Sequence, residues 1–247
     1  MISRGQLLNL YWSARAQIAP TLRHAQDFYE DVLKDSVHSD SVWLDLGCGH
    51  QIFPEWRFSQ EKELTRICKT IVGVDYDFAS LLRHRSIGMK VQSDIGRLPF
   101  ADESFNLVTA NMVVEHLDSP EKQFSEVARV LKRGGLFIFL TPNANGYFAV
   151  LRRFVPNAIN NTLVSLLDGR RAADVFPVHY KANTAGRVKQ LADGSQFEVV
   201  NQRLLVTDAV FSVVPPLMLV ELLWLRALMT SKLRPWRTNL LAILRKQ

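Results

Sequence analysis

The sequence predicts an α/β fold, a Rossmann-like sheet of seven mostly parallel strands with helices on both faces and helical insertions near the C-terminus. Short β-branched or aromatic runs alternate with stretches of helical periodicity over residues 41–142, the pattern of a parallel sheet covered on both sides. The 247 residues are 47% hydrophobic, enough to bury a substantial core. No internal repeat or low-complexity tract is present, so we expect one domain over residues 1–247, with 41–142 as its core.

The elements follow from the periodicity of the apolar residues. Residues 1–40 are expected to form leading helices, because apolar positions recur at helical spacing over 6–33. The expected strands lie at 42–44, 71–74, 90–93, 105–110, 136–140, 197–200 and 239–244. Further helices are expected at 61–68, from residue 78, at 120–131 and at 184–191. For the last strand, a short amphipathic helix is the alternative.

Two segments, residues 143–182 and 207–237, interrupt this alternation and are interpreted as insertions on the substrate side. Loops longer than about 12–15 residues in compact domains are usually functional or disordered. In the second segment, apolar residues from Pro216 follow helical spacing, and a basic cluster at 232–237 comes directly after. Such a helix can pack as a lid, lie on a membrane surface or form a dimer contact, and the sequence leaves these alternatives open.

The net charge of +6 comes from the C-terminal part of the chain. Residues 1–150 hold 16 Lys and Arg against 18 Asp and Glu, residues 151–200 hold 7 against 4, and residues 201–247 hold 7 against 2. An anionic partner such as a phosphate, a lipid headgroup or a nucleic acid is one explanation, and a solvated basic face is the other. The apolar stretch 209–229 contains two prolines and two charges, which argues against a bilayer-spanning helix of roughly 20 residues.

The cysteines and the N-terminus indicate a reducing compartment. Cys48 and Cys68 cannot form a disulfide framework, and no Cys/His spacing resembles a zinc site. Residues 1–10 carry Arg4 but lack an apolar run followed by a small-residue cleavage site. We therefore expect a cytoplasmic protein, with residues 209–237 as a candidate peripheral contact at the inner face of the membrane.

A glycine-bearing turn follows the first expected strand, within LDLGCG at residues 44–49. Glycine lets the backbone approach a ligand closely and tolerates positive φ. Asp45, just ahead of the turn, fits a carboxylate that orients the loop and accepts a hydrogen bond from the ligand. Asp75 ends the next apolar strand, and a carboxylate there can accept both hydroxyls of a ribose. Together these features indicate a nucleotide-like ligand.

These residues resemble the class I S-adenosylmethionine-dependent methyltransferase family, in its type 11-like branch. The resemblance covers residues 42–143, some two fifths of the chain. Its motifs, in order, are LDLGCG (44–49), GVD (73–75), SDIGRLPFADESFNLV (93–108), VVEHL (113–117) and EVARVLKRGGLFIFLTPN (126–143). The resemblance implies an enzyme that uses S-adenosyl-L-methionine as its cofactor.

The resemblance also implies the residues that bind this cofactor. Gly47 and Gly49 would pack against its methionine part, and Asp75 would bind the ribose. Asp94 would meet the adenine amine, with Ile95 against the ring. The full expected set is Asp45, Gly47, Cys48, Gly49, Asp75, Tyr76, Asp94, Ile95 and Asn111. Acids suit a cofactor without phosphate, whereas a nicotinamide dinucleotide needs a helix N-terminus that cradles pyrophosphate.

The turn departs from the family pattern at one position. Gly49 is followed by His50 and Gln51, where the family often has a third glycine. That glycine allows close packing of the next helix on the strand. We therefore expect this helix to start later or to pack less closely.

The loop at residues 111–117 holds the candidate general base. A histidine titrates near neutral pH, so His116 could remove the proton of a hydroxyl acceptor. The alternative is that Glu115 and His116 pack structurally, as they do in relatives with different substrates. In ubiquinone-pathway O-methyltransferases a metal-binding glutamate precedes this pair, and Met112 occupies its place here. The resemblance therefore implies no metal site.

A second segment, FPVHYKANT at residues 176–184, resembles more weakly a stretch found in methyltransferases of bacterial surface-polysaccharide biosynthesis. It contains His179 as an alternative base, and Asn183 or Thr184 is expected to be a helix N-cap. The sequence lacks the Asn/Asp-Pro-Pro-aromatic signature of enzymes that methylate exocyclic amines or amides. Nucleic acid is therefore a disfavoured partner.

The leading hypothesis is an enzyme that methylates a hydroxyl of a small-molecule, glycan or lipid-linked acceptor. Carbon methylation, as in quinone biosynthesis, is the catalytic alternative. A non-catalytic protein that binds S-adenosylmethionine is the alternative from another class. Three acids placed at the expected site, Asp45, Asp75 and Asp94, argue against an inactive scaffold.

Overall fold

The computed structural model describes residues 3–152 and 177–247. Two compact units divide the chain. We call one the sheet unit, made of residues 26–142, 178–203 and 240–247, and the other the helical unit, made of residues 1–25, 143–177 and 204–239. Within the first expected insertion, residues 153–176 lie outside the described residues. The expectation of a single domain over the whole chain stays a prediction.

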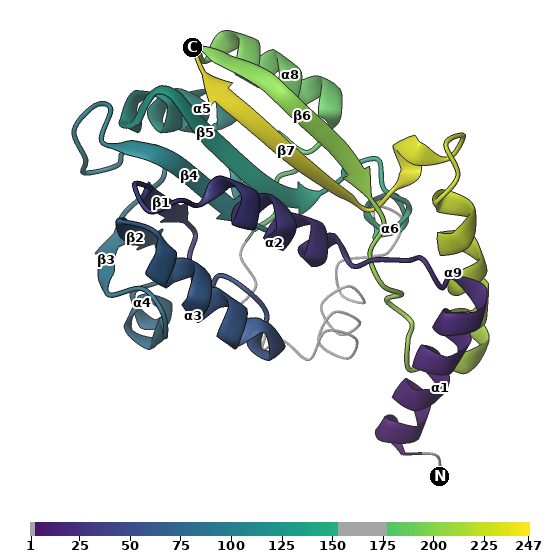
Figure 1. Cartoon of the computed structure of the whole chain (residues 1–247). Helices are drawn as coiled ribbons and strands as arrows, with labels where there is room; N and C mark the ends of the chain where they lie inside the picture. Colours follow the sequence, from purple (N-terminus) through teal and green to yellow (C-terminus); the bar gives the residue numbers. More distant parts are fainter. Residues whose placement is uncertain (1–2, 153–176) are drawn as a thin grey trace. The chain divides into compact units, whose positions relative to one another are not determined.

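A seven-stranded sheet forms the centre of the sheet unit (Figure 1). Its strands are β1 (Val42–Leu46), β2 (Thr70–Asp75), β3 (Met89–Gln92), β4 (Phe105–Asn111), β5 (Leu131–Pro142), β6 (Phe197–Leu205) and β7 (Asn239–Lys246). Their order across the sheet is β3-β2-β1-β4-β5-β7-β6. The neighbours from β3 to β5 pair in parallel. β7 is antiparallel to β6, since the N–H of Gln247, directly after β7, donates to the carbonyl of Gln196, directly before β6.

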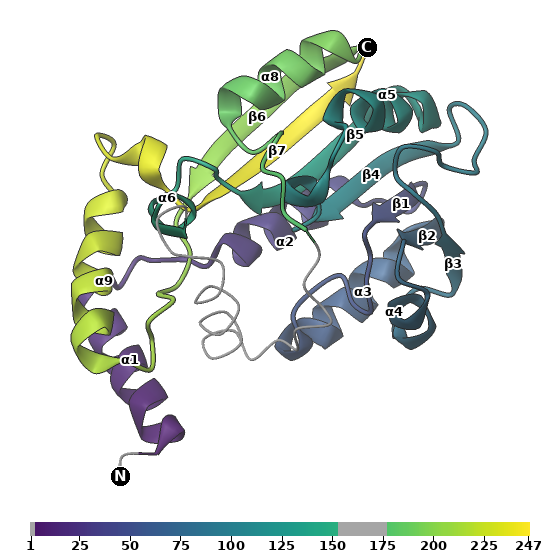
Figure 2. The same ribbon diagram turned by 180° about the vertical axis from the view of Figure 1, so that it is seen from behind.

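Helices cover both faces of this sheet. They are α2 (Ala25–Ser36), α3 (Phe58–Ile67), α4 (Phe78–Arg83), α5 (Pro120–Val130) and α8 (Ala185–Gly194). α2 and α3 lie on one face, and α5 and α8 lie on the other (Figures 1 and 2). Between them the core buries the large side chains Tyr29, Trp43, Phe124, Phe137 and Phe139. The expected Rossmann-like fold is therefore confirmed.

Two strands differ from their expected bounds. β5 begins at Leu131 rather than at 136, because it continues through a polar stretch containing Gly134 at φ +76°. Its pairing with β4 shifts register between Phe105 and Leu107. This shift accommodates the extra residues of β5 between Leu131 and Leu136. β6 continues to Leu205 because it is an edge strand, where polar side chains remain exposed to solvent. The C-terminal segment is a strand and not the alternative helix.

The helical unit contains α1 (Arg4–Ile18), α6 (Tyr147–Arg152) and α9 (Pro215–Leu228). The leading helices expected over 6–33 are thus α1 and α2. One face of α9 packs with α1 in an apolar core that includes Tyr11, Leu22, Met218, Leu222 and Leu225. Among the described residues, no helix is long and apolar enough to cross a membrane.

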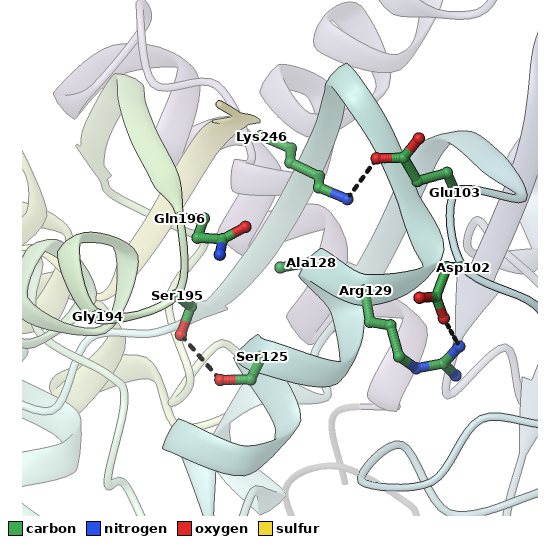
Figure 3. Close-up of a pocket in the computed structure, with 9 residues that line it drawn as sticks. All are labelled: Asp102, Glu103, Ser125, Ala128, Arg129, Gly194, Ser195, Gln196 and Lys246. Atoms are coloured by element: carbon green, nitrogen blue, oxygen red, sulfur yellow. Dashed lines mark hydrogen bonds and ion pairs between the residues drawn. The ribbon is translucent and has the colours of Figure 1, made fainter.

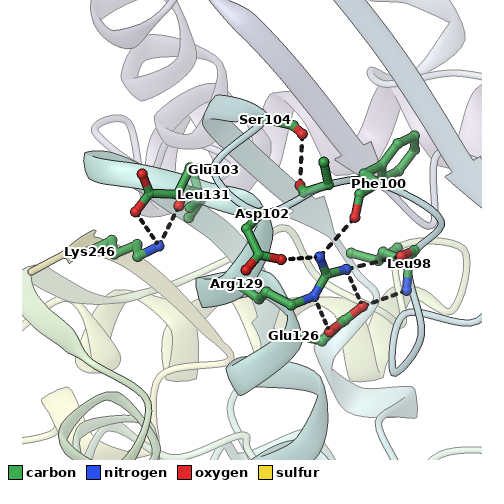
Figure 4. A network of polar contacts seen from close by, with 10 residues as sticks. Leu98, Phe100, Asp102, Glu103, Ser104, Glu126, Arg129, Leu131 and Lys246 are labelled. Atoms are coloured by element: carbon green, nitrogen blue, oxygen red, sulfur yellow. Dashed lines mark hydrogen bonds and ion pairs between the residues drawn. The ribbon is translucent and has the colours of Figure 1, made fainter.

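In the sheet unit, Arg129 of α5 holds the segment that leads into β4 (Figure 4). Its guanidinium donates to the carbonyl oxygens of Leu98 at 3.0 Å and Phe100 at 2.8 Å, and to the carboxylate of Asp102 at 2.7 Å. The Glu126 carboxylate accepts from the same guanidinium at 2.7 Å. This contact holds the pKa of Glu126 below its usual range. One side chain thus fixes three points of the loop.

Replacing Arg129 by alanine tests this contribution. We expect Arg129→Ala to lower the free energy of unfolding by about 1–3 kcal/mol, because two loop carbonyls and two carboxylates lose a charged donor. Urea denaturation measures the change. The control is Arg133→Ala at an exposed position of β5, which should stay within about 0.5 kcal/mol of the wild type. Equal losses in both variants would contradict the role of Arg129.

Candidate functional site

The glycine turn after β1 has the backbone conformation that glycine favours. Gly47 has φ +60° and Gly49 has φ +53°, a region that other residues enter at a cost. A Cβ added to Gly47 would lie 2.4 Å from Cγ2 of Val113, whereas a Cβ on Gly49 would meet nothing within 4 Å. The backbone of Gly47 therefore packs tightly beneath the loop after β4, and Gly49 faces open space.

Asp75 joins the end of β2 to this turn. One oxygen of its carboxylate accepts from the backbone N–H of Gly49 at 2.8 Å, and the other accepts from the N–H of Asp77 at 2.8 Å. The backbone N–H of Cys48, a buried residue, donates to Val74 at 3.0 Å. The expected residues of the turn and of the second strand are therefore brought together.

The third expected group follows β3. The N–H of Ser93 donates to the carbonyl of Asp75 at 3.1 Å, so this loop lies beside the end of β2. Asp94 is exposed, and its carboxylate accepts from the N–H of Gly96 at 2.7 Å. The ring of Tyr76 is exposed to solvent. Asp94 and Tyr76 therefore have accessible side chains at the same edge.

Ile95 connects this edge to the centre of the sheet. It lines a small apolar cavity of about 10 Å³ with Leu46 at the end of β1, Ala110 in β4 and Val113 in the loop that follows. A space of this size is close to the lower limit for one water molecule. The side chain of Ile95 is thus packed against the carboxyl ends of two central strands.

Asn111, the last residue of β4, makes contacts that the sequence did not suggest. Its amide group and that of Gln26 in α2 exchange two hydrogen bonds, both of 3.0 Å. The Asn111 amide also donates to the carbonyl of Ile52 at 3.2 Å. Gln26 carried no motif, so no local signal could have identified it. Asn111 therefore links α2, β4 and the loop after the glycine turn.

Asp45 is buried between the central strands and does not lie at the surface. The indole N–H of Trp43 donates to the hydroxyl of Thr109 at 2.7 Å, and that hydroxyl donates to Asp45 at 2.5 Å. Burial raises the pKa of Asp45 to about 7, and the negative charges of Glu61 and Asp75 add to the effect, whereas the Thr109 hydrogen bond opposes it. Its expected contact with a ligand stays a prediction.

Glu61 of α3 was missed by the sequence analysis. It is fully buried, and its carboxylate accepts from the N–H groups of Ile52 at 3.0 Å and Phe53 at 2.9 Å, and from the hydroxyl of Ser86 at 2.5 Å. The loop after Gly49 is therefore held by a carboxylate. α3 begins at Phe58, after the short 3₁₀ helix η1 (Glu55–Arg57) and three residues before its expected start at 61; the comparison with the helix start in the family stays a prediction.

His116 lies in η2 (Val114–His116), directly after β4, and its side chain is partly exposed. The carbonyl of Glu115 accepts from the N–H groups of His179 at 2.8 Å and Tyr180 at 3.2 Å. This pair of hydrogen bonds attaches the segment with the alternative base to the loop with the leading one. Both candidate histidines therefore belong to the same end of the sheet.

A buried polar chain supports this arrangement. The hydroxyl of Thr141 donates to the buried carboxylate of Glu115 at 2.9 Å, and the amide of Asn183 donates to Thr141 at 2.6 Å and to the carbonyl of Pro142 at 3.1 Å. Asn183 therefore connects the His179 segment to β5. Thr184 is the N-cap of α8, since its side chain accepts from the N–H of Arg187, as one of the two expected caps.

A separate polar pocket of about 380 Å³ lies at the opposite end of the parallel strands (Figure 3). Its lining includes Lys246 at the end of β7, which donates to the carbonyl of Leu131 at 2.7 Å and to the carboxylate of Glu103 at 3.3 Å. Ser125 and Ser195 lie 3.5 Å apart across it. None of the expected site residues lines this pocket.

The carboxyl end of the parallel strands is therefore the candidate site, as expected for a doubly wound sheet. It combines a glycine turn, a carboxylate at the next strand end and two histidines on the following segments. Among the described residues, no group of three or more His, Cys, Asp or Glu side chains is arranged to hold a metal ion. The carboxylates of Asp75 and Asp94 at this end of the sheet suit hydroxyl and cationic groups of a ligand better than phosphates.

The fold and this site define a class of protein. Residues 44–139 match the family model of the methyltransferase domain. Together with the fold, this match supports a class I S-adenosyl-L-methionine-dependent methyltransferase domain over these residues, a family whose cofactor is S-adenosyl-L-methionine. This result confirms the family expected from the five motifs.

Curated relatives share part of the chain. A "Probable S-adenosylmethionine-dependent methyltransferase" of Mycolicibacterium smegmatis is 30% identical over 103 residues, 40% of this chain and 37% of its own length. The malonyl-[acyl-carrier protein] O-methyltransferase of Legionella pneumophila is 36% identical over 104 residues, 40% of this chain and 35% of its own length. The chain thus spans little more than a third of these two relatives.

Solved structures share the fold over most of the chain. The YcgJ protein of Bacillus subtilis superposes with a TM-score of 0.57 at 17% identity, covering 89% of this chain and 98% of its own. The geranyl diphosphate C-methyltransferase of Streptomyces coelicolor, solved with S-adenosyl-L-homocysteine, superposes with a TM-score of 0.52 at 15% identity, covering 90% and 79%. At these identities the similarity concerns the fold.

The buried carboxyl of Asp45 predicts a pH dependence of stability. Its folded pKa of about 7 lies above the unfolded value of 3.8, so ionisation between these values destabilises the folded state as the pH rises. Asp45→Asn keeps an acceptor for Thr109 and cannot ionise. We expect the stability of the wild type relative to this variant to fall between pH 4 and 7, by on the order of 2–4 kcal/mol.

Urea denaturation across this pH range measures the difference. Asp40→Asn, at an exposed position ahead of β1, is the matched control and should leave the pH profile of the wild type unchanged. Parallel profiles for the wild type and Asp45→Asn would show that Asp45 does not titrate in this range.

Proposed function

We propose that this protein transfers the methyl group of S-adenosyl-L-methionine to a hydroxyl of a small-molecule, glycan or lipid-linked acceptor. The observation that carries the proposal is the junction of Gly49 and Asp75. Their 2.8 Å hydrogen bond joins a turn with open space in front of it to a carboxylate at the next strand end. That arrangement suits a ligand with an adenosyl ribose and no phosphate.

Each of the expected residues would take part in binding the cofactor. Gly47 and Gly49 would let the backbone approach the methionine part of the cofactor, and Asp75 would accept hydrogen bonds from the ribose hydroxyls. The exposed side chains of Tyr76 and Asp94 would contact the adenine, together with Ile95. Asp45, Cys48 and Asn111 would hold the turn and the strand ends. The bound cofactor supplies an electrophilic methyl group on a sulfonium.

We assign His116 as the general base that removes the proton of the acceptor hydroxyl. It lies in η2, the element after β4, at the strand end where the glycine turn also lies. The buried carboxylate of Glu115 and its contact with Thr141 would keep this loop rigid, and rigidity favours alignment of the hydroxyl with the methyl group. His179 is the alternative base, because its backbone is hydrogen-bonded to the same loop.

The name of one curated relative supports oxygen as the acceptor atom. The Legionella relative is named an O-methyltransferase and is 36% identical over the matched region. The Streptomyces C-methyltransferase shares only the fold, so it carries no argument for carbon methylation. For the acceptor class we include lipid-linked molecules, with residues 209–237 as a peripheral membrane contact, because this segment presents apolar and basic side chains.

The cofactor assignment is tested by calorimetric titration with S-adenosyl-L-methionine. Asp75→Asn removes the charge of the carboxylate with little change in size, and we expect at least about tenfold weaker binding. Asp77→Asn makes the same charge change two residues away, at the partly exposed N-cap of α4. Since asparagine caps helices as well as aspartate, this control should keep wild-type affinity. Equal affinity in all three proteins, or binding by none, would contradict the assignment.

The assignment of His116 is tested by turnover. Cell extracts are incubated with methyl-labelled S-adenosyl-L-methionine, and the label is followed into lipid, soluble glycan and small-molecule fractions. His116→Ala should lower the labelling rate by about 10²–10⁴-fold and leave cofactor affinity unchanged. His179→Ala is the matched variant. Loss of turnover only in His179→Ala would make His179 the base, and unchanged turnover in His116→Ala would remove His116 from this role.

A further inference from the structure

The described residues of the polar pocket shown in Figure 3 all belong to the sheet unit. They come from the turn ahead of β4, from α5, from the turn between α8 and β6 and from the end of β7. The volume of about 380 Å³ lies within the range of about 300–1,000 Å³ that is typical of small-molecule sites. Because charged groups, hydroxyls and an amide line it, the pocket suits a small polar ligand.

Two residues of the pocket have a backbone conformation that is costly for residues other than glycine. Glu103 has φ +54° and Gln196 has φ +61°. Among the described residues, the other non-glycine residues with positive φ are Met112 and Tyr180, which lie on the two segments that carry the candidate bases. Backbone strain of this kind concentrates at ligand sites. The pocket therefore shares a feature of local structure with the candidate active site.

A buried ammonium group lies in the wall of the pocket. The side chain of Lys246 is 8% exposed. It donates to the carbonyl of Leu131 at 2.7 Å and to the carboxylate of Glu103 at 3.3 Å, and the second distance exceeds the roughly 2.7–2.9 Å of a close charge-assisted hydrogen bond. An ammonium group has three N–H donors, and within the described part of the chain it contacts these two acceptors. Lys246 can therefore donate to a further group.

The hydroxyls of the pocket are also loosely engaged, whereas Arg129 is fully engaged. The oxygens of Ser125 and Ser195 lie 3.5 Å apart, beyond the roughly 2.5–3.0 Å of a hydroxyl–hydroxyl hydrogen bond. Arg129 instead uses all five N–H groups at 2.7–3.0 Å, on two carbonyl oxygens and on the carboxylates of Asp102 and Glu126. Arg129 is thus a fixed part of the wall, and the serines are available to a ligand.

The charges that line the pocket restrict the class of ligand. Asp102 and Glu103 contribute two carboxylates, and Arg129 and Lys246 contribute two cations. An anion near the Lys246 ammonium would also meet the Glu103 carboxylate, which lies 3.3 Å from it, and a cation near that carboxylate would meet the ammonium. A zwitterion avoids both conflicts. In an α-amino acid one carbon separates the amino and carboxyl groups, so both can contact a close ion pair.

We propose that this pocket binds a free α-amino acid. Lys246 donates to the carboxylate of the ligand, Glu103 accepts from its ammonium group, and the hydroxyls of Ser125 and Ser195 bind its remaining polar atoms. The pocket lies at the opposite end of the parallel strands from the glycine turn, because Glu103 precedes β4 and Lys246 contacts Leu131 at the start of β5. It is therefore a second binding site, and the proposal does not depend on methyl transfer.

The test begins with a thermal-shift screen of the common free amino acids. The amino acid that raises the melting temperature most is then titrated by calorimetry, and we expect saturable binding. Two matched probes are the same molecule without its amino group and the same molecule without its carboxyl group. Each should bind at least about tenfold more weakly, because each loses one charge-assisted contact.

Two variants assign the charges of the ligand to the pocket. Glu103→Gln changes an exposed side chain with little change in size; it should weaken binding by at least about tenfold and remove the preference for the amino group. Lys246→Met should remove the preference for the carboxyl group. Since Lys246 is buried and its replacement can affect folding, Glu103→Gln is sufficient by itself. Glu198→Gln, at an exposed position of β6 outside the pocket lining, is the control and should keep wild-type affinity.

Several results would overturn the proposal. They are absence of saturable binding by every amino acid, equal weakening in Glu103→Gln and Glu198→Gln, and full affinity for the probe that lacks either charge. S-adenosyl-L-methionine itself has an amino-acid end, so the titration is repeated in its presence. Unchanged affinity is expected, and competition would place the amino acid in the cofactor site instead. Glu103→Gln should bind S-adenosyl-L-methionine normally, so failure here is distinguishable from failure of the proposed function.

Discussion

Two consecutive buried hydrogen bonds tie the central strands β1 and β4 together, from the Trp43 indole to Thr109 and from Thr109 to Asp45. Because β1 lies between β2 and β4 in parallel register, the turn at its end is flanked by the loops that follow both neighbours. Asp75 and Val113 meet that turn for this reason. In open α/β sheets, the ligand binds where strand connections diverge in this way. The pairing of β1 is therefore the constraint on which the candidate site depends.

The loop beyond the turn shows how one structural solution can replace another. A third glycine would have allowed the next helix to start close to the strand. Here Gly49 is followed by His50 and Gln51, without a third glycine. The Glu61 carboxylate instead accepts hydrogen bonds from the backbone of Ile52 and Phe53. A fully buried carboxylate is costly unless hydrogen bonds satisfy it, and three donors do so at Glu61. The loop between Gly49 and η1 is thus held by hydrogen bonds to the side chain of Glu61.

The sequence predicted most of the seven strands because they are short apolar runs bounded by polar or glycine residues, and it predicted the glycine turn and Asp75 from their positions relative to these runs. It did not predict Gln26 or Asn183 as partners, since such hydrogen bonds join residues far apart in the chain and leave no periodic trace. The two faces of α9 were ambiguous for another reason: a helix that is apolar on most sides does not indicate which face is covered.

Gly47 and Val113 also have a consequence for how this protein can diverge. The absent Cβ at one position is filled by the side chain at the other, so a larger residue at 113 or any side chain at 47 demands a compensating change in its partner. Substitutions at these two positions are therefore expected to be non-additive. Homologous chains that alter the loop after β4 to accept other substrates would have to preserve the small volume at this contact, which makes the pair a joint marker of evolutionary constraint.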